Sequence, residues 1–235
     1  MRTTPKYRAL DDVEIARTLE RLHSRIAERF PESGLRSVCQ ELIAVTGETR
    51  ECVAFLRAPH WPIRAAVGLA IAAMGVVLVM AAITQGLPAR GWGEIDSAKN
   101  SLVFMGVAVF FLLSIEPRIK RRRALAVVHQ LRSLAHVIDM HQLTKDPERL
   151  LSPEIPDTSS SPERTMNASE LGRYLDYCSE LLSVTSKLSA LLVQYFNDPV
   201  LLGAVNEIET LTTGLSRKIW QKIQLLDSGR IAAGA

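Results

Sequence analysis

The chain has 235 residues, of which 47% are hydrophobic and 23% are charged, and its formal net charge is +3 at pH 7. This charge is too small to predict nucleic-acid binding by itself, and an aromatic content of 6% argues against a base-stacking surface. The odd number of cysteines, without a CxxC or Cys/His pair at zinc spacing, excludes a disulfide framework and predicts small core residues at Cys39, Cys52 and Cys178.

Residues 1–60 predict an N-terminal cytoplasmic helical hairpin. The first residues lack the apolar segment and cleavage site of a signal peptide. Asp11-x-x-Glu14 resembles a capping box, and Pro31 with Gly34 separates two helices. Apolar residues recur at helical spacing and predict the buried faces Ile15, Leu19, Leu22, Ile26 and Phe30, then Leu35, Val38, Leu42, Val45, Cys52 and Leu56.

The first membrane span is predicted at about residues 63–85. Its sequence carries no charge from Ala65 to Ile83, which as a helix reaches about 28 Å, close to the hydrocarbon thickness of a bilayer. Trp61 precedes it, where an indole favours the headgroup level. Small residues predict a helix-packing face at Ala65, Gly68, Ala72, Gly75 and Ala82. This face would pack against the second span of the same chain, against a second copy, or both.

The second span is predicted at about residues 98–117, after an external loop at 86–97. Ser101 to Ile115 is short for a span, reaching about 22 Å, but Lys99 and Arg118 flank it and can snorkel. Lys and Arg are denser on both outer flanks than in the loop, which predicts a multi-pass protein of the inner (plasma) membrane with both termini cytoplasmic. Residues 61–118 thus form a transmembrane hairpin.

The inner boundary of the second span carries one acidic residue and a basic run. Glu116 is expected to pair with a nearby arginine, although a ring of Glu116 side chains in an oligomer is an alternative. The run is predicted to face anionic headgroups, with specific lipid or partner binding as the alternative, through Arg118, Lys120, Arg121, Arg122 and Arg123. The apolar cores of the spans, Ala65 to Ile83 and Ser101 to Ile115, hold no Asp, Glu, Lys, Arg or His, which counts against a transporter.

Residues 119–143 predict a juxtamembrane helix that continues the second span from Ser97 to near Leu143, with Pro117 kinking it. Its apolar stripe is Val127, Val128, Leu131, Leu134, Ala135 and Ile138. The polar side of this predicted helix is interpreted as a solvated face, so no metal site is predicted. The weak alternative is a metal or ligand site formed by His129, His136, Asp139 and His141.

Residues 144–167 predict a Pro/Ser-rich linker, and 168–235 a C-terminal cytoplasmic helical hairpin. Asn167-x-x-Glu170 matches a capping-box variant, Asp198-Pro199 predicts the start of the last helix, and Gly229 predicts its end. The predicted core positions are Leu171, Tyr174, Leu175, Cys178, Leu181, Leu182, Leu188, Leu192 and Tyr195, then Leu201, Ile208, Leu211, Leu215, Ile219 and Leu226.

The sequence therefore predicts an all-α fold, a two-helix transmembrane hairpin that carries a cytoplasmic helical bundle with coiled-coil-like packing. No catalytic motif is present, so we expect no enzyme activity and no cofactor. The expected function is a membrane-anchored scaffold or regulatory subunit. Its expected partners are the bilayer with its anionic headgroups, further copies of the chain or another membrane or cytoplasmic protein, and no nucleic acid. The alternatives are an oligomeric pore or channel-like effector and, third, a metal-dependent enzyme on the juxtamembrane helix.

Overall fold

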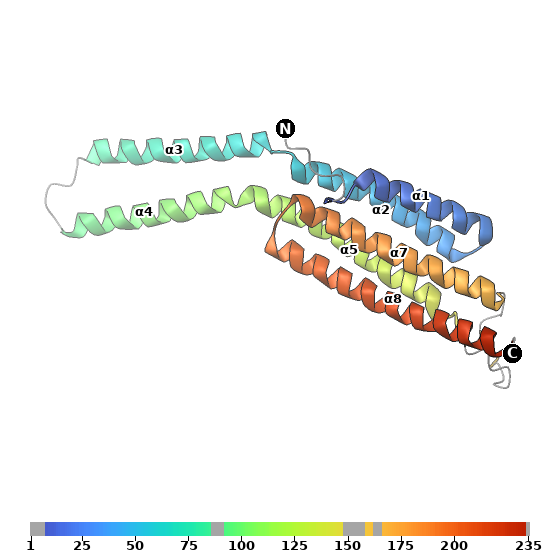
Figure 1. Ribbon diagram of the computed structural model, residues 1–235. Coiled ribbons are helices and arrows are strands. Elements are labelled where there is room, and N and C mark those ends of the chain that lie inside the picture. Colours follow the sequence, from blue (N-terminus) through green and yellow to red (C-terminus); the bar gives the residue numbers. More distant parts are fainter. Residues whose placement is uncertain (1–7, 86–91, 148–157, 162–165, 234–235) are drawn as a thin grey trace. The chain divides into compact units, whose positions relative to one another are not determined.

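The computed structural model describes residues 8–85, 92–147, 158–161 and 166–233, and all regular structure within them is helical (Figure 1). The prediction of an all-α fold is confirmed. Two compact units are present: residues 58–122 form one, and the residues before and after them form the other. Parts of the predicted external loop (86–91) and linker (148–157 and 162–165) lie outside the described residues.

The larger unit is a helical bundle. Its helices are α1 (Asp12–Arg29), α2 (Gly34–Arg57), α7 (Ala168–Tyr195), α8 (Pro199–Ala233) and the greater part of α5 (Ile115–Leu143). Each contributes its predicted apolar stripe to one continuous core, so the predicted helical bundle is confirmed (Figure 1). Leu134, Tyr195 and Leu211 pack against this core and are only partly buried.

The three cysteines are free and buried in the core, as predicted. Burial raises the pKa of the Cys39 thiol and that of the Cys178 thiol to about 12. Because the thiolate is the reactive form, these side chains act as small apolar core residues.

Three helix starts follow the predicted capping chemistry. Asn167 and Glu170 form the complete reciprocal capping box at the start of α7. Asp198 Oδ1 accepts hydrogen bonds from two backbone N–H groups of the first turn of α8, at 3.1 and 3.0 Å. Asp11 caps α1 in the same way, but Glu14 pairs with Arg17 and does not close the box.

Two predicted helix boundaries are wrong. α8 continues through Gly229 to Ala233. A glycine costs a helix only about 1 kcal/mol relative to alanine, and the buried Leu226 holds this turn against the core. The helix of the second apolar segment, α4 (Trp92–Leu113), begins before the predicted start at Ser97 and within the predicted external loop.

The predicted continuous helix from Ser97 to Leu143 is interrupted at Ser114, where α4 ends and α5 begins. Pro117 has no N–H to donate to the carbonyl four residues earlier, which removes one bond of the helical ladder. The Ser114 N–H is shared between the carbonyls of Phe110 and Phe111, both at 3.1 Å, and its hydroxyl donates to the Phe111 carbonyl at 2.7 Å. The predicted kink is therefore a break.

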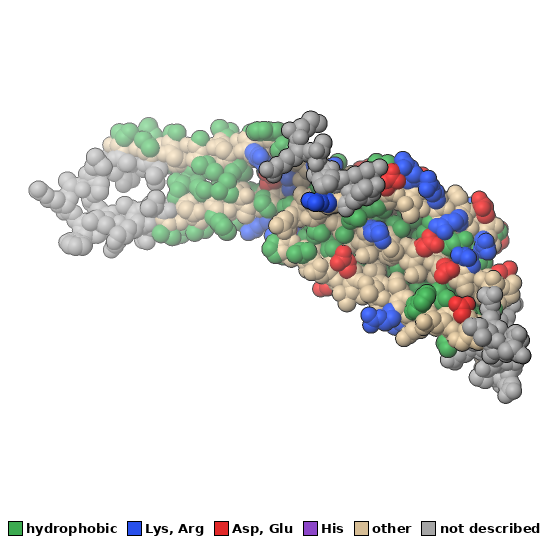
Figure 2. Space-filling model, in the orientation of Figure 1, with side chains coloured by type: hydrophobic (Ala, Val, Ile, Leu, Met, Phe, Trp, Pro, Cys, Tyr) green, Lys and Arg blue, Asp and Glu red, His purple; other side chains and the backbone are tan. Residues whose placement is uncertain are grey.

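The smaller unit contains α3 (Trp61–Gln85), α4 and the start of α5. The half-buried side chains of α3 and α4 are large except for Ala108: Ile63, Val67, Ile71 and Met74 on α3, and Met105, Val109 and Leu112 on α4. Many other large apolar side chains are exposed, among them Leu69 (73%), Phe104 (75%) and Phe110 (72%). Figure 2 shows hydrophobic side chains over these helices and charged side chains mixed over the bundle.

One helical stretch among the described residues is long and apolar enough to cross a membrane, judged by length and composition. It falls within Gly34–Val77, and none of its most apolar window is buried. The longest charge-free part of this stretch is the part of α3 that begins at Ala65.

We expect Leu181→Ala to destabilise the bundle by about 2–5 kcal/mol, because Leu181 is fully buried and its truncation leaves a cavity. Leu202→Ala is the matched control, since Leu202 is 43% exposed on α8 and should cost about 0.5 kcal/mol or less. Denaturant unfolding of the full chain in detergent micelles, followed by circular dichroism, measures both. Equal losses for the two variants would contradict the assigned core.

Candidate functional site

The most concentrated group of charges in the smaller unit surrounds Glu116, in the first turn of α5. Arg64 Nε, on α3, donates to Glu116 Oε2 at 2.8 Å. Lys120 Nζ lies 3.1 Å from Glu116 Oε1, and His60 Nδ1 lies 3.7 Å from the same oxygen. One carboxylate therefore joins the start of α3, the residue before it and the start of α5.

This cluster is largely withdrawn from solvent. The exposed fractions of the Glu116 and Lys120 side chains are 15% and 11%. Lys120 Nζ also donates to the Ala58 carbonyl at 3.0 Å, so the ammonium is held by a charged and a neutral acceptor. Removing one partner of such a pair leaves the other charge buried and unpaired. The resulting loss of stability is larger than the net stability that the intact pair contributes. Glu116 and Lys120 must therefore be treated as one unit.

Sequence reasoning predicted an arginine partner for Glu116 and that prediction is confirmed, with Arg64 as the partner. It missed Lys120, which was assigned to the headgroup surface but is buried beside Glu116. The sequence could have predicted this pair. Residues four apart on a helix are neighbours on its surface, and Glu116 precedes Lys120 by four.

The other members of the basic run divide between two environments. Arg118, Arg122 and Arg123 are exposed, and Arg121 is half-buried. The Arg118 guanidinium lies 5.0 Å from the Phe111 ring centroid, and that of Arg123 lies 4.4 Å from the Phe55 ring centroid on α2. Three of the five residues of this run therefore present a positive charge to the surroundings.

The predicted small-residue face of α3 points away from α4 where it is described. Ala65, Gly68, Ala72 and Gly75 are exposed, whereas the side chain of Ala82 lies outside the described residues. A Cβ added at Gly68 or Gly75 would meet no atom within 4 Å. The contact with α4 uses the neighbouring stripe of larger side chains instead, so these four residues do not serve packing within the chain.

The four candidate metal ligands on α5 do not converge. His129 and His136 are exposed, and Asp139 accepts a hydrogen bond from Gln142 Nε2 at 2.6 Å. His141 lies against the first residue of α2, where a Cβ on Gly34 would come within 2.4 Å of its Cε1. Within the described ranges, no group of three or more His, Cys, Asp or Glu side chains is arranged to hold a metal ion.

Comparison with known proteins yields no family: no family model, no curated protein and no solved structure matches this chain significantly.

We expect Glu116→Gln to lower the thermal unfolding temperature of the full chain in detergent more than Arg64→Gln does. The first change strands the buried Lys120 ammonium, whereas the second removes a side chain that is 53% exposed and can turn to water. The double variant Glu116→Gln/Lys120→Met should recover part of the loss, because it removes the stranded charge. An Arg64→Gln effect as large as that of Glu116→Gln would contradict this arrangement.

His141 makes the stability of the bundle depend on pH. Burial, and secondly the nearby Lys145 ammonium, lower the pKa of His141 from 6.5. The unfolded chain therefore binds the proton more readily, so this contribution is complete above pH 6.5 and is lost as the pH falls from 6.5 through the lowered pKa. We expect His141→Gln to weaken the acid destabilisation between about pH 7 and pH 5, the interval in which imidazoles titrate.

The control for this experiment is His136→Gln, which changes an exposed histidine on the same helix. Denaturant midpoints at several pH values compare the two variants with the unchanged chain. An identical pH dependence of the chain with and without His141 would show that this imidazole is not the group responsible.

Proposed function

We propose that the protein is a membrane-anchored helical scaffold. In this proposal α3 and α4 form a hairpin in the bilayer, and both chain ends are cytoplasmic. The bundle of α1, α2, α5, α7 and α8 lies on that side, and copies of the chain associate through the small-residue face of α3. The observation that carries the proposal is the outer surface of α3 and α4, which is apolar and, along one stripe of α3, free of bulky side chains.

The anchoring part of the proposal is supported by exposure. Soluble proteins rarely expose contiguous apolar surface on this scale, and Leu69, Phe104 and Phe110 are each more than 70% exposed. Lipid tails would cover these side chains. The exposed guanidinium groups of Arg118 and Arg122 follow the apolar helices in sequence, and this is the position at which basic residues contact anionic headgroups.

The self-association part is supported by the direction of the small residues. Two transmembrane helices gain little from apolar contact alone, because lipid is as apolar as the partner helix, so close approach of backbones provides the attraction. Gly68 and Gly75 lie on the same side of α3, two turns apart, with open space around them. A second copy of α3 is a partner that presents the complementary surface.

The Glu116 cluster favours this scaffold over a pore. A ring of Glu116 carboxylates would need side chains that face a common lumen. Each Glu116 is instead paired with Arg64 and Lys120 of its own chain. Ion flux through liposomes that contain the purified protein would instead support the pore hypothesis.

We expect the paired change Gly68→Leu/Gly75→Leu to abolish or strongly reduce crosslinked dimers and larger species in native membranes. Leucine at both positions keeps the backbones several ångströms apart, which removes the close contact. The matched control is Ala66→Leu/Ala73→Leu, which adds two leucines at the same spacing on a different exposed part of α3. Resistance to alkaline carbonate extraction confirms that both variants remain in the membrane.

Two results would overturn the self-association proposal. One is a chain that crosslinks only as a monomer and copurifies with no partner before any change is made. The other is an equal loss of crosslinking in both leucine pairs, because the small face would then have no special role. Release of the unchanged chain by alkaline carbonate would overturn the membrane anchor itself.

A further inference from the structure

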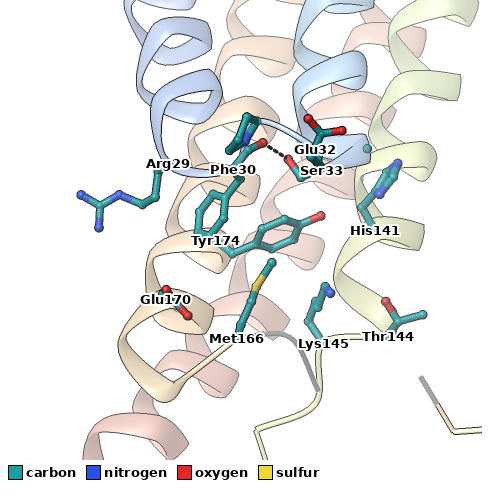
Figure 3. Close-up of a pocket in the computed structure, with 12 residues that line it drawn as sticks. Arg29, Phe30, Glu32, Ser33, His141, Thr144, Lys145, Met166, Glu170 and Tyr174 are labelled. Carbon is teal, nitrogen blue, oxygen red and sulfur yellow. Dashed lines mark hydrogen bonds between the residues drawn. The ribbon is translucent and has the colours of Figure 1, made fainter. Parts of the chain in front are cut away.

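The bundle contains a pocket of about 590 Å³ at the end where the α1–α2 turn, the end of α5 and the start of α7 meet. Its size lies within the range of small-molecule sites in proteins. Figure 3 shows that Phe30, Tyr174 and Met166 form an apolar wall, and that the Tyr174 hydroxyl, Lys145 and His141 approach the same space. An apolar wall beside a few converging polar groups is the usual composition of a ligand site.

The Tyr174 hydroxyl is the first sign that the pocket takes a ligand. Tyr174 is only 2% exposed, and its ring packs edge to face on that of Phe30, with centroids 5.5 Å apart. No hydrogen bond joins its hydroxyl to another described residue, although the hydroxyl points into the pocket (Figure 3). The hydroxyl oxygen is not among the buried polar atoms that lack a partner, so water reaches it in the pocket, and a ligand acceptor can take the place of that water.

The second sign is the start of α2, which lines the pocket through Ser33 and Gly34. The first turn of a helix has N–H groups without intrahelical partners and carries partial positive charge. Ser33, which precedes this turn, donates its hydroxyl to the Phe30 carbonyl at 2.8 Å, and no described side chain caps α2. The other bundle helices that begin in this unit are capped by Asp11, Asn167 and Asp198.

The third sign is the Lys145 ammonium, whose backbone is fixed by another residue. Lys145 lines the pocket, its Nζ lies 5.5 Å from the Tyr174 ring centroid, and no described carboxylate pairs with it. Lys222 on α8 donates to the carbonyls of Gln142 and Lys145 at 2.9 and 3.0 Å, which fixes the end of α5. The backbone that carries the Lys145 ammonium is therefore positioned before any ligand arrives.

The remaining charges of the lining do not cancel this positive character at the centre. Glu170 Oε2 accepts the hydrogen bond of Asn167 N at 2.9 Å and is committed to the capping box. Glu32 is exposed, and Figure 3 shows the Arg29 guanidinium turned away from Tyr174. The groups that face the pocket are thus an ammonium, an unpaired hydroxyl and a helix N-terminus, all of which favour an acceptor with negative charge.

We propose that this pocket binds a small organic anion, with its carboxylate or phosphate at Lys145, the Tyr174 hydroxyl and the start of α2, and its apolar body against Phe30 and Met166. This site is independent of the scaffold function, since it lies wholly within the bundle.

Calorimetric titration of the full chain in detergent micelles tests the proposal with three probes. Phenyl phosphate carries both features, inorganic phosphate carries the charge alone and benzyl alcohol carries the ring alone. We expect saturable binding of one phenyl phosphate per chain with a Kd of about 1 mM or lower, weaker binding of inorganic phosphate and no binding of benzyl alcohol. Benzyl alcohol binding as tightly as phenyl phosphate, or no saturable binding of either phosphate, would overturn the proposal.

Variants locate the bound anion. Tyr174→Phe and Lys145→Gln should each raise the Kd for phenyl phosphate about tenfold or more, since each removes a hydrogen bond to a charged group. Tyr177→Phe is the control for the first, because Tyr177 also packs on Phe30 but is not part of the lining. Lys218→Gln, on the exposed side of α8, is the control for the loss of one positive charge. Equal effects of a variant and its control would place the anion elsewhere.

Discussion

A single carboxylate, Glu116, holds together the polar end of the two apolar helices. It pairs with Arg64 at the start of α3 and with Lys120 one turn along α5, and Lys120 in turn reaches the Ala58 carbonyl. The cluster fixes the first turn of α5, directly after the break at Ser114. The same helix continues from Glu116 to the bundle core, where Leu131 and Ile138 are fully buried, so α5 belongs to both units.

The two faces of α3 differ in the size of their side chains. Large side chains such as Ile71 and Met74 fill the contact with α4, whereas the glycines lie on the side that no described residue covers. A hairpin that used its glycines internally would be more tightly closed and would have no surface left for a second copy. In this chain larger side chains make the described contact between α3 and α4, and Gly68 and Gly75 face open space.

The sequence was sufficient for the bundle because its information is local. Periodic leucines located the buried faces, and short polar motifs at Asn167 and Asp198 located helix starts to the residue. It was insufficient where the outcome depends on distant partners. The burial of Lys120 needs Ala58, and the pocket needs three segments, 29–34, 141–145 and 166–174, that are far apart in the chain. Of the predicted candidate ligands, only His141 lies in that pocket, and the neighbours that define its role, Gly34 and Tyr174, were predicted only as a chain break and a core residue.

The last residues of α5 and the first residues of α7 are each held by specific contacts. On one side Lys222 holds the carbonyls of Gln142 and Lys145, and on the other the capping box of Asn167 and Glu170 starts α7. The end of α5 therefore depends on α8, and the start of α7 depends on its own cap. A change at Lys222 would loosen the end of α5, although the two lie on different helices.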